Sequence, residues 1–337
     1  MATKIADAGG TTASFSNTPQ AQDDAYNLTE DTVVLASGSQ TVIVLDVMAN
    51  DQGGNAKSLF SVDDGISGST ATKQYAPIDL THQDYQTLGI SAWETIGDGV
   101  SIRINNGKVE MDLGGYLAAH GFSSLQAMGP NDHFSETFTY AIKLGNGTLS
   151  WASVSVNIQG TNDGAVITAV PGADLTVVEA GGVANGTLND PNAHGQLIIT
   201  DPDVGQNHFQ APPSLQGTYG TFTFDTTTGV WAYTLNQTLA DPLTQGQPVT
   251  DTLTVKSADG TASYNIVVNI TGTNDAPVAV ANVNSVKEDT APNSVGGNVL
   301  TNDTDVDNGD THSVTAVNGS AGNVGANLVG TYGTLHL

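Results

Sequence analysis

Two short phrases each occur twice in this chain, and their spacing fixes the size of its structural unit. Gly-Thr-Asn-Asp stands at 160–163 and again at 272–275, which is 112 positions later. Gly-Thr-Tyr-Gly-Thr stands at 217–221 and again at 330–334, which is 113 positions later. A period of this length exceeds the ~20–50 residues of a solenoid repeat and matches a self-contained domain of ~100–150 residues. The chain is therefore predicted to be a series of similar domains.

The charge balance excludes several classes of partner. The 337 residues include 8 Lys and Arg against 34 Asp and Glu, so the formal net charge is −26. Binding to nucleic acid or to anionic lipid is not expected, because phosphate contacts need cations. The acids occur in short clusters between alternating segments rich in Val, Ile, Thr and Tyr, which predicts a folded chain and not a disordered one.

Several other signals are missing from the sequence. It has no cysteine, which excludes disulfides and thiolate metal sites. No run of ~20 apolar residues predicts a membrane span, and the first residues do not form a cleaved secretory signal of the usual kind.

Most of the chain is predicted to form antiparallel strands. Short segments that alternate apolar and polar residues are separated by Gly, Asn and Asp, as in half-buried strands joined by turns. Many such strands with frequent turns are typical of β-sandwiches. The predicted hairpins pair 134–142 with 151–158, 221–225 with 230–235, and 251–256 with 264–270. The predicted core residues of the second domain are Phe222, Phe224, Trp231, Tyr233 and Leu235.

We therefore predict an all-β chain of tandem immunoglobulin- or cadherin-like β-sandwich domains in an extended array, with one short helix. The helix is expected within 116–128, where Gly121 limits it to one or two turns. The predicted parts are an extended leader (1–20), a divergent sandwich with a central insertion (21–163), a second sandwich (164–275) and an incomplete further repeat (276–337).

The last predicted part has the opening strands of a repeat without its closing hairpins. Its Gly-Thr-Tyr-Gly phrase corresponds to one that is followed by about fifty more residues in the second domain. A sandwich without those strands would expose long edges. We expect the natural polypeptide to continue, or another chain to complete this part.

Acidic and amide residues recur at corresponding places in successive repeats. Carboxylate and amide oxygens at this density suit Ca²⁺, which takes 6–8 oxygen ligands. The alternative is that Asn and Asp only form turns and Glu only solvates an edge. The candidate ligands are Asp24, Glu30, Asp51, Asn162, Asp163, Glu179, Asp201, Asp203, Asn274, Asp275, Glu288, Asp303, Asp305 and Asp307.

Other sites are not supported by the sequence. The segment Asp303–Gly309 differs from an EF-hand loop, because its glycine comes one place late and Val314 stands at the twelfth position. His208 and His312 follow comparable acidic loops, but two histidines in different domains do not make a zinc site. No catalytic motif is present, so we expect neither an enzyme nor a bound organic cofactor.

The repeated phrases resemble the VCBS and cadherin-like repeats of large bacterial surface adhesins of the type I-secreted, RTX type. The resemblance is carried by Gly160–Asp163, Gly272–Pro277, Val299–Asp307 and the two Gly-Thr-Tyr-Gly phrases, and it covers about 160–337 closely. The centre of the first domain, about 57–130, departs from it. The resemblance implies an extracellular location at the bacterial cell surface, calcium binding, and a role in adhesion or biofilm cohesion.

The leading hypothesis is a non-enzymatic structural or adhesive protein whose domains are stiffened by Ca²⁺. Its partners would be neighbouring repeats of the same or a longer chain, and glycans or proteins of a cell surface. One alternative is a subunit of an extracellular filament or sheath, a homopolymer built by strand exchange. Another is a carbohydrate- or peptide-binding first domain that uses Tyr75, Tyr85 and Trp93.

Overall fold

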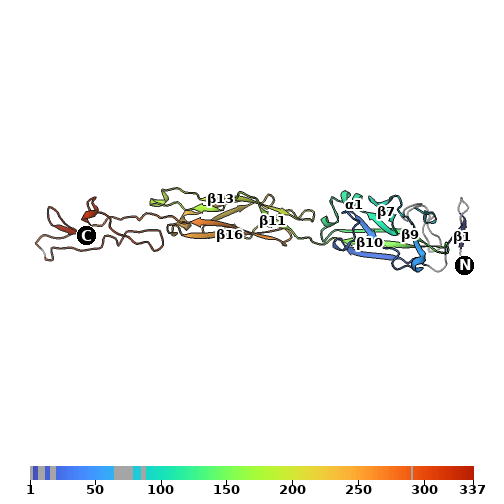
Figure 1. Cartoon of the computed structure of the whole chain (residues 1–337). Coiled ribbons are helices and arrows are strands. Elements are labelled where there is room, and N and C mark those ends of the chain that lie inside the picture. The colour runs from blue at the N-terminus through green and yellow to red at the C-terminus, as the bar shows by residue number, and fades with distance from the viewer. Residues whose placement is uncertain (1–2, 7–11, 16–19, 64–78, 85–88, 290) are drawn as a thin grey trace. The chain divides into compact units, whose positions relative to one another are not determined.

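The chain folds as two compact units built almost entirely from β-strands (Figure 1). The computed structural model describes residues 3–6, 12–15, 20–63, 79–84, 89–289 and 291–337. Unit 1 comprises Met1–Ala165 with Thr200–Asn207, and unit 2 comprises Val166–Ile199 with His208–Leu337. This architecture confirms the prediction of an all-β chain of β-sandwiches.

Unit 1 is a sandwich of two sheets. The first sheet has the order β1-β2-β10-β9-β5, and β3 pairs in parallel with β10; the second has the order β4-β8-β7-β6. The segment predicted as a leader contributes β1 and β2. The strands of the first sheet are β1 (Thr3–Ala6), β2 (Thr12–Phe15), β3 (Asp24–Thr29), β5 (Lys57–Asp63), β9 (His133–Leu144) and β10 (Leu149–Gln159). Those of the second are β4 (Val42–Leu45), β6 (Glu94–Gly97), β7 (Val100–Asn105) and β8 (Lys108–Asp112).

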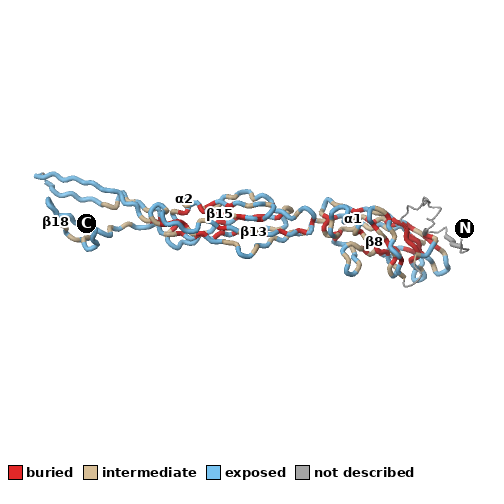
Figure 2. Tube along the Cα trace, turned by 90° about the horizontal axis from the view of Figure 1, so that it is seen from above, coloured by how far each residue is buried: buried red, intermediate tan, exposed pale blue. Residues whose placement is uncertain are grey.

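Buried residues from both sheets form the core of unit 1; buried segments are red in Figure 2. Val154, Val156 and Ile158 of β10 are buried at every second position, as are Ile102 and Ile104 of β7. The predicted hairpin is confirmed, since β9 and β10 pair antiparallel along their whole length. Period-two burial of this kind follows from the alternation of side chains along a strand.

Helix is a minor component, as predicted. In the first domain α1 spans Gly114–Ala119 and ends before Gly121, whose φ of +82° lies in the left-handed region. The second α-helix, α2, spans Gln237–Ala240. None of the described helices has the length and hydrophobicity to cross a membrane. The 3₁₀ turns are η1 (Glu30–Thr32), η2 (Gly54–Ala56), η3 (Asp79–Thr81), η4 (Leu125–Ala127), η5 (Val183–Asn185) and η6 (Ala321–Asn323).

Unit 2 contains a second sandwich and a separate hairpin. One sheet has the order β11-β13-β15-β14 and the other β12-β17-β16. The two predicted hairpins of this domain are confirmed as β14–β15 and β16–β17. The strands are β11 (Val166–Ala169), β12 (Thr176–Val178), β13 (Asn192–Thr200), β14 (Gly220–Phe224), β15 (Val230–Leu235), β16 (Pro248–Lys256), β17 (Ser263–Thr271), β18 (Asn327–Val329) and β19 (Thr334–His336).

Most of the predicted core residues of the second domain are buried. Phe222, Trp231, Tyr233 and Leu235 are at most 4% exposed. Phe224 differs, because it is only half-buried and packs edge-on against Phe209 with ring centroids 5.1 Å apart. It is the last residue of β14.

The Gly-Thr-Tyr-Gly phrase forms a cradle for a buried carboxylate. The backbone N–H groups of Thr218, Tyr219 and Gly220 donate to Asp251 of β16 at 2.7, 2.9 and 3.0 Å, and the Tyr233 hydroxyl donates to it at 2.7 Å. Asp251 is only 2% exposed. Glycine is required at 217, because a Cβ there would lie 2.2 Å from an Asp251 oxygen. The cradle thus joins the two sheets of the sandwich.

We expect Asp251→Asn to lower the free energy of unfolding of unit 2 by about 3 kcal/mol or more, since hydrogen bonds to a charged group contribute ~1.5–3 kcal/mol each. Hydrogen exchange of the β16 and β17 amides measures this loss. Asp190→Asn, at an exposed turn of the same unit, is the matched control and should change exchange little. Equal effects of the two substitutions would contradict a structural role for the cradle.

Candidate metal centres

The first acidic cluster lies wholly in unit 1 and is called cluster A. It brings together three segments that are far apart in sequence: η1 directly after β3, the residues after β10, and the loop 200–207 after β13. Ala127 O of η4 accepts the backbone N–H of Val204 at 3.2 Å and so anchors that loop. The members of cluster A are Glu30, Asp31, Asp163, Asp201 and Asp203.

Backbone amides hold the carboxylates of cluster A in place. The N–H of Thr161 donates to Glu30 Oε1 at 2.7 Å, and the Thr161 hydroxyl donates to the same oxygen. The N–H of Asp163 donates to Asp203 Oδ2 at 3.1 Å, and the N–H of Asp203 donates to Asp201 Oδ1 at 2.9 Å. The carboxylates of Glu30, Asp201 and Asp203 are therefore oriented by backbone amides and not by a basic side chain.

These bonds leave oxygen atoms of cluster A buried without a donor. Among the described residues, none hydrogen-bonds to Glu30 Oε2, Asp163 Oδ2 or Asp203 Oδ1. Burial raises the pKa of Asp163, and the charges of Asp31 and Glu30 raise it further. Burial likewise raises the pKa of Asp203, although the hydrogen bond from Asp163 N–H lowers it. Such atoms are costly to bury unless a cation or proton neutralises them.

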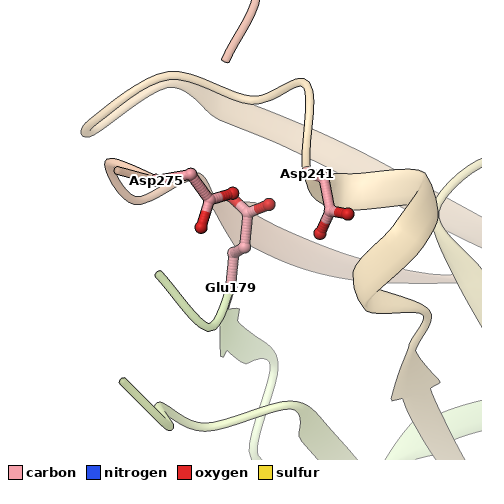
Figure 3. Close-up of side chains that lie close together, drawn as sticks. All are labelled: Glu179, Asp241 and Asp275. Carbon is pink, nitrogen blue, oxygen red and sulfur yellow. The ribbon is translucent and has the colours of Figure 1, made fainter. Parts of the chain in front are cut away.

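The second acidic cluster lies wholly in unit 2 and is called cluster B. Glu179 follows β12, Asp241 follows α2, and Asp275 follows β17; their side chains point toward one another (Figure 3). These three residues offer oxygen atoms that all lie within 4.8 Å of one another, and Asp305, Asp307 and Asp310 form a second such group. The members of cluster B are Glu179, Asp241, Asp275, Asp305, Asp307 and Asp310.

Cluster B repeats the hydrogen bonds of cluster A. The N–H of Thr273 donates to Glu179 Oε2 at 3.0 Å, as Thr161 does to Glu30. The N–H of Asp275 donates to Asp307 Oδ2 at 2.9 Å, and the N–H of Asp307 donates to Asp305 Oδ1 at 3.0 Å. The same backbone geometry therefore positions a glutamate and three aspartates twice in the chain.

Cluster B also leaves oxygen atoms buried without a donor. In the described parts of the chain these are Glu179 Oε1, both oxygens of Asp275 and Asp307 Oδ1. Glu179 is fully buried. Burial raises its pKa from 4.5 to about 7, the Thr273 N–H lowers it, and the charges of Asp275 and Asp241 raise it. Burial and neighbouring acids also raise the pKa values of Asp275 and Asp307.

The two clusters differ in charge at the position three residues after the second aspartate of the loop. In cluster A, Gln206 Nε2 donates to Asp203 Oδ2 at 3.0 Å and to Asn162 Oδ1 at 3.3 Å. In cluster B an acid, Asp310, takes the place of this glutamine. Cluster B therefore holds more negative charge in a comparable arrangement and has a greater need for counter-cations.

The structure distributes the predicted ligands over several places. It brings Glu30, Asp163, Asp201 and Asp203 together in cluster A, and Glu179, Asp275, Asp305 and Asp307 in cluster B. Asn162 and Asn274 adjoin them, and each side-chain amide donates to the carbonyl of the following aspartate. The predicted residues outside both clusters are Asp24, Asp51, Glu288 and Asp303.

Those four residues have other surroundings. Asp51 accepts the Tyr140 hydroxyl at 3.0 Å and the backbone N–H of Gln22 at 2.8 Å. Burial raises the pKa of the nearby Asp24 to about 6. Asp303 accepts the N–H of Val280 at 2.8 Å, and Glu288 is exposed.

Sequence reasoning left three cluster members out of the ligand set: Asp31, Asp241 and Asp310. Asp31 and Asp310 each lie beside a predicted ligand in an acidic stretch, which was a usable signal. Asp241 stands alone before Pro242 and has no repeated phrase around it, so only the fold brings it to Glu179.

Of the three aromatic residues considered as a binding surface in the first domain, the structure describes only Trp93. Trp93 is 39% exposed, and the Arg103 guanidinium lies 4.3 Å from its ring centroid. Arg103 is held there by Glu110, with contacts of 2.6 and 2.7 Å. Tyr75 and Tyr85 lie outside the described residues.

Comparison with known proteins finds similarity to cadherin ectodomains. No protein-family model and no curated protein matches the chain. Drosophila N-cadherin EC1-3 is 14% identical with a TM-score of 0.31, and the alignment covers 76% of this chain and 66% of that chain. The PcdhgB3 EC1-4 structure is 13% identical with a TM-score of 0.29, covering 75% and 48%. The human desmocollin-1 ectodomain is 11% identical with a TM-score of 0.23, covering 74% and 35%.

This similarity concerns the β-sandwich repeat alone. The chain spans about two thirds of the N-cadherin fragment and about half of the protocadherin fragment. TM-scores this low transfer no residue role to this chain, so the chemistry of the clusters depends on the contacts described above.

The raised pKa of Glu179 predicts how stability depends on pH when a chelator is present. The folded state binds a proton here more tightly than the unfolded state, so the free energy of unfolding of unit 2 falls as pH rises from about 4.5 to about 7. The loss is on the order of 3 kcal/mol, at ~1.4 kcal/mol per pKa unit. Urea denaturation in EDTA at several pH values measures it. Glu179→Gln should flatten the dependence, and an unchanged slope in that variant would contradict the assignment.

Proposed function

We propose that the chain is a non-enzymatic extracellular repeat protein, structural or adhesive, whose clusters A and B bind Ca²⁺. One observation carries this proposal: the same amide-held carboxylate arrangement occurs twice, and each copy leaves buried oxygens without a donor. A catalytic acid pair would be needed once in a molecule. An arrangement that recurs with each repeat is better explained by a structural role in every repeat.

The ligand atoms favour calcium over other metals. The clusters offer carboxylate, amide and backbone oxygens, which suit hard cations. Softer metals such as zinc favour thiolate and imidazole ligands, whereas cluster B is made of carboxylates with one imidazole beside them, that of His312, 3.9 Å from Asp305. Several carboxylates from separate segments suit the large, flexible coordination of Ca²⁺ better than the octahedral, water-rich shell of Mg²⁺.

Chain connectivity supports a stiffening role. Asp163 precedes Val166, the first residue of unit 2, by three positions, and the loop 200–207 belongs to unit 1 while both of its flanking segments belong to unit 2. A cation shared by Asp163, Asp201 and Asp203 would tie together all the segments through which the chain passes between units. We infer that bound calcium limits motion at this junction.

The biological setting follows from the same proposal. An acidic calcium-dependent array fits the outside of a cell, where calcium is at millimolar levels and weak sites are filled. We place the protein at the bacterial cell surface, in adhesion or biofilm cohesion, with neighbouring repeats and cell-surface glycans or proteins as partners. Assembly into a filament by strand exchange is the alternative.

Calcium should stabilise both units. At a free concentration a hundredfold above Kd, binding to the folded state adds about 2.7 kcal/mol to the free energy of unfolding. We expect Tm in millimolar CaCl₂ to exceed Tm in EDTA, with no comparable rise in NaCl of equal ionic strength. Differential scanning calorimetry together with isothermal titration of Ca²⁺ measures both effects.

Matched variants distinguish calcium binding at cluster A from calcium binding at cluster B. Asp203→Asn should abolish the calcium response of unit 1 and leave that of unit 2, whereas Asp275→Asn should do the reverse. Asp190→Asn is the control, because Asp190 is exposed and lies in neither cluster. If all three variants titrate like the original protein, the ions do not bind at clusters A and B.

Stiffening has its own test. Small-angle X-ray scattering should show a narrower distribution of maximum dimensions in Ca²⁺ than in EDTA, and Asp203→Asn should lose this difference. If Ca²⁺ binds without any change in scattering, the proposed metal sites are supported and the proposed stiffening is contradicted.

A further inference from the structure

The acidic loops of clusters A and B contain the same turn with one important difference. The turn spans Asp203–Gln206 in cluster A and Asp307–Asp310 in cluster B. In each, the N–H of the last residue donates to the carbonyl of the first, at 3.2 and 3.4 Å respectively. The glycine at the third position has a φ of +85° in cluster A and +88° in cluster B. The second position is Val204 in cluster A and Asn308 in cluster B, so only cluster B carries a side-chain amide there.

The backbone of this second position is anchored in the same way in both loops. The N–H of Val204 donates to Ala127 O at 3.2 Å, and the N–H of Asn308 donates to Pro242 O at 3.1 Å, directly after the cluster member Asp241. The side chain of Asn308 is exposed. No described residue hydrogen-bonds to that side chain or to the N–H of Gly309. Both groups are therefore free to react with each other.

An asparagine followed by a glycine can lose its side-chain amide without an enzyme. The backbone nitrogen of the glycine attacks Cγ of the asparagine, the Cγ–Nδ2 bond breaks, and the glycine N–H proton leaves with the amide nitrogen as ammonia. Water then opens the resulting cyclic imide at one of its two carbonyls, which gives aspartate or isoaspartate. Glycine favours this attack because it has no Cβ beside its nitrogen and adopts many backbone conformations.

The chain has five Asn-Gly pairs, and the structure distinguishes one of them from the rest. Three of the asparagines lie in the left-handed region, where the next backbone nitrogen is nearly opposite Cβ and cannot reach Cγ. These are Asn106, Asn185 and Asn318, with φ values of 51°, 58° and 50°. In the fourth pair, the side-chain oxygen of Asn146 accepts the N–H of Thr148 at 3.0 Å. Asn308 has neither restraint, so it is the asparagine best placed to react.

We propose that Asn308 is a self-modification site, whose amide converts to a carboxylate in the folded protein with water as the only co-reactant. The product adds an acid between Asp307 and Asp310 of cluster B, whereas Val204 keeps cluster A unchanged. Because the number of charged ligands tunes the affinity of a Ca²⁺ site, the modification tightens calcium binding at cluster B. It also increases the repulsion between the acids when calcium is absent. These two consequences rest on the proposed function, but the modification itself does not.

Peptide mapping by mass spectrometry tests the modification. The full-length protein is incubated in EDTA at mildly alkaline pH, and the peptides that contain the five Asn-Gly pairs are followed over time. We expect Asn308 to show the mass change from amide to acid severalfold faster than every other pair, with both aspartate and isoaspartate formed. The same incubation in urea is the control, where the five rates should converge because denaturation removes the turns. Equal rates in the folded protein, or a faster rate at another pair, would overturn the assignment.

Two variants of the full-length chain test the consequence for calcium. Asn308→Asp carries the aspartate product, and Asn308→Val introduces the residue that cluster A has at this position. Both are made together with Asp203→Asn, which removes calcium binding by cluster A. Isothermal titration should show severalfold tighter Ca²⁺ binding for Asn308→Asp than for Asn308→Val, and in EDTA the Asn308→Asp protein should have the lower Tm. Asn318→Asp makes the same chemical change outside the cluster and should titrate as the original residue does.

The two measurements distinguish failure of this proposal from failure of the calcium function. If Asn308 reacts selectively but Asn308→Asp and Asn308→Val bind Ca²⁺ equally, the modification site is supported and its effect on calcium is contradicted. If none of the variants binds Ca²⁺, the proposed function is contradicted, and the mass measurement still decides whether Asn308 is modified.

Discussion

Hydrogen bonds from backbone amides to buried carboxylates hold this molecule together. With 8 basic residues against 34 acids, most carboxylates cannot be paired with a basic side chain. The chain instead directs its own N–H groups at them: three at Asp251, and one each at Glu30, Glu179, Asp203 and Asp307. Such charge-assisted bonds are stronger than neutral ones. These hydrogen bonds also fix the direction of each carboxylate. In turn, each carboxylate fixes the conformation of the loop whose N–H groups it accepts.

This constraint explains which parts of the structure the sequence could predict. The backbone N–H groups of Thr161 and Asp163 donate to Glu30 and Asp203, so the repeated Gly-Thr-Asn-Asp phrase supplies donors that bind these carboxylates. Because the phrase occurs twice, the sequence indicated where both clusters lie. The alternating segments predicted the hairpins because burial on one face repeats every second residue. Asp241 could not be predicted, since it reaches Glu179 only through α2. Glu288 matched the pattern of Glu30 in sequence, but in the structure it is exposed.

The two clusters show how one substitution changes the demand for a cation. The side-chain amide of Gln206 donates a hydrogen bond to Asp203 in cluster A and so partly compensates the negative charge of the carboxylates. In cluster B, Asp310 removes this donor and adds a charge, and only His312 lies near. Unneutralised acids at this spacing repel strongly where water is excluded. Cluster B therefore has the greater need for a neutralising cation.

The number of donors at each acid separates structural carboxylates from those that need a partner. Asp251 receives four hydrogen bonds, so it needs neither ion nor proton. Glu179 and Asp275 have oxygens that no described donor reaches, and they face other acids, so they need a neutralising partner, which the proposed calcium would supply. Asp24 and Asp51 fall between these cases: Tyr140 donates to Asp51, and one oxygen of each acid stays buried without a donor. Burial raises the pKa of Asp24 to about 6, so this carboxyl takes up a proton at mildly acidic pH.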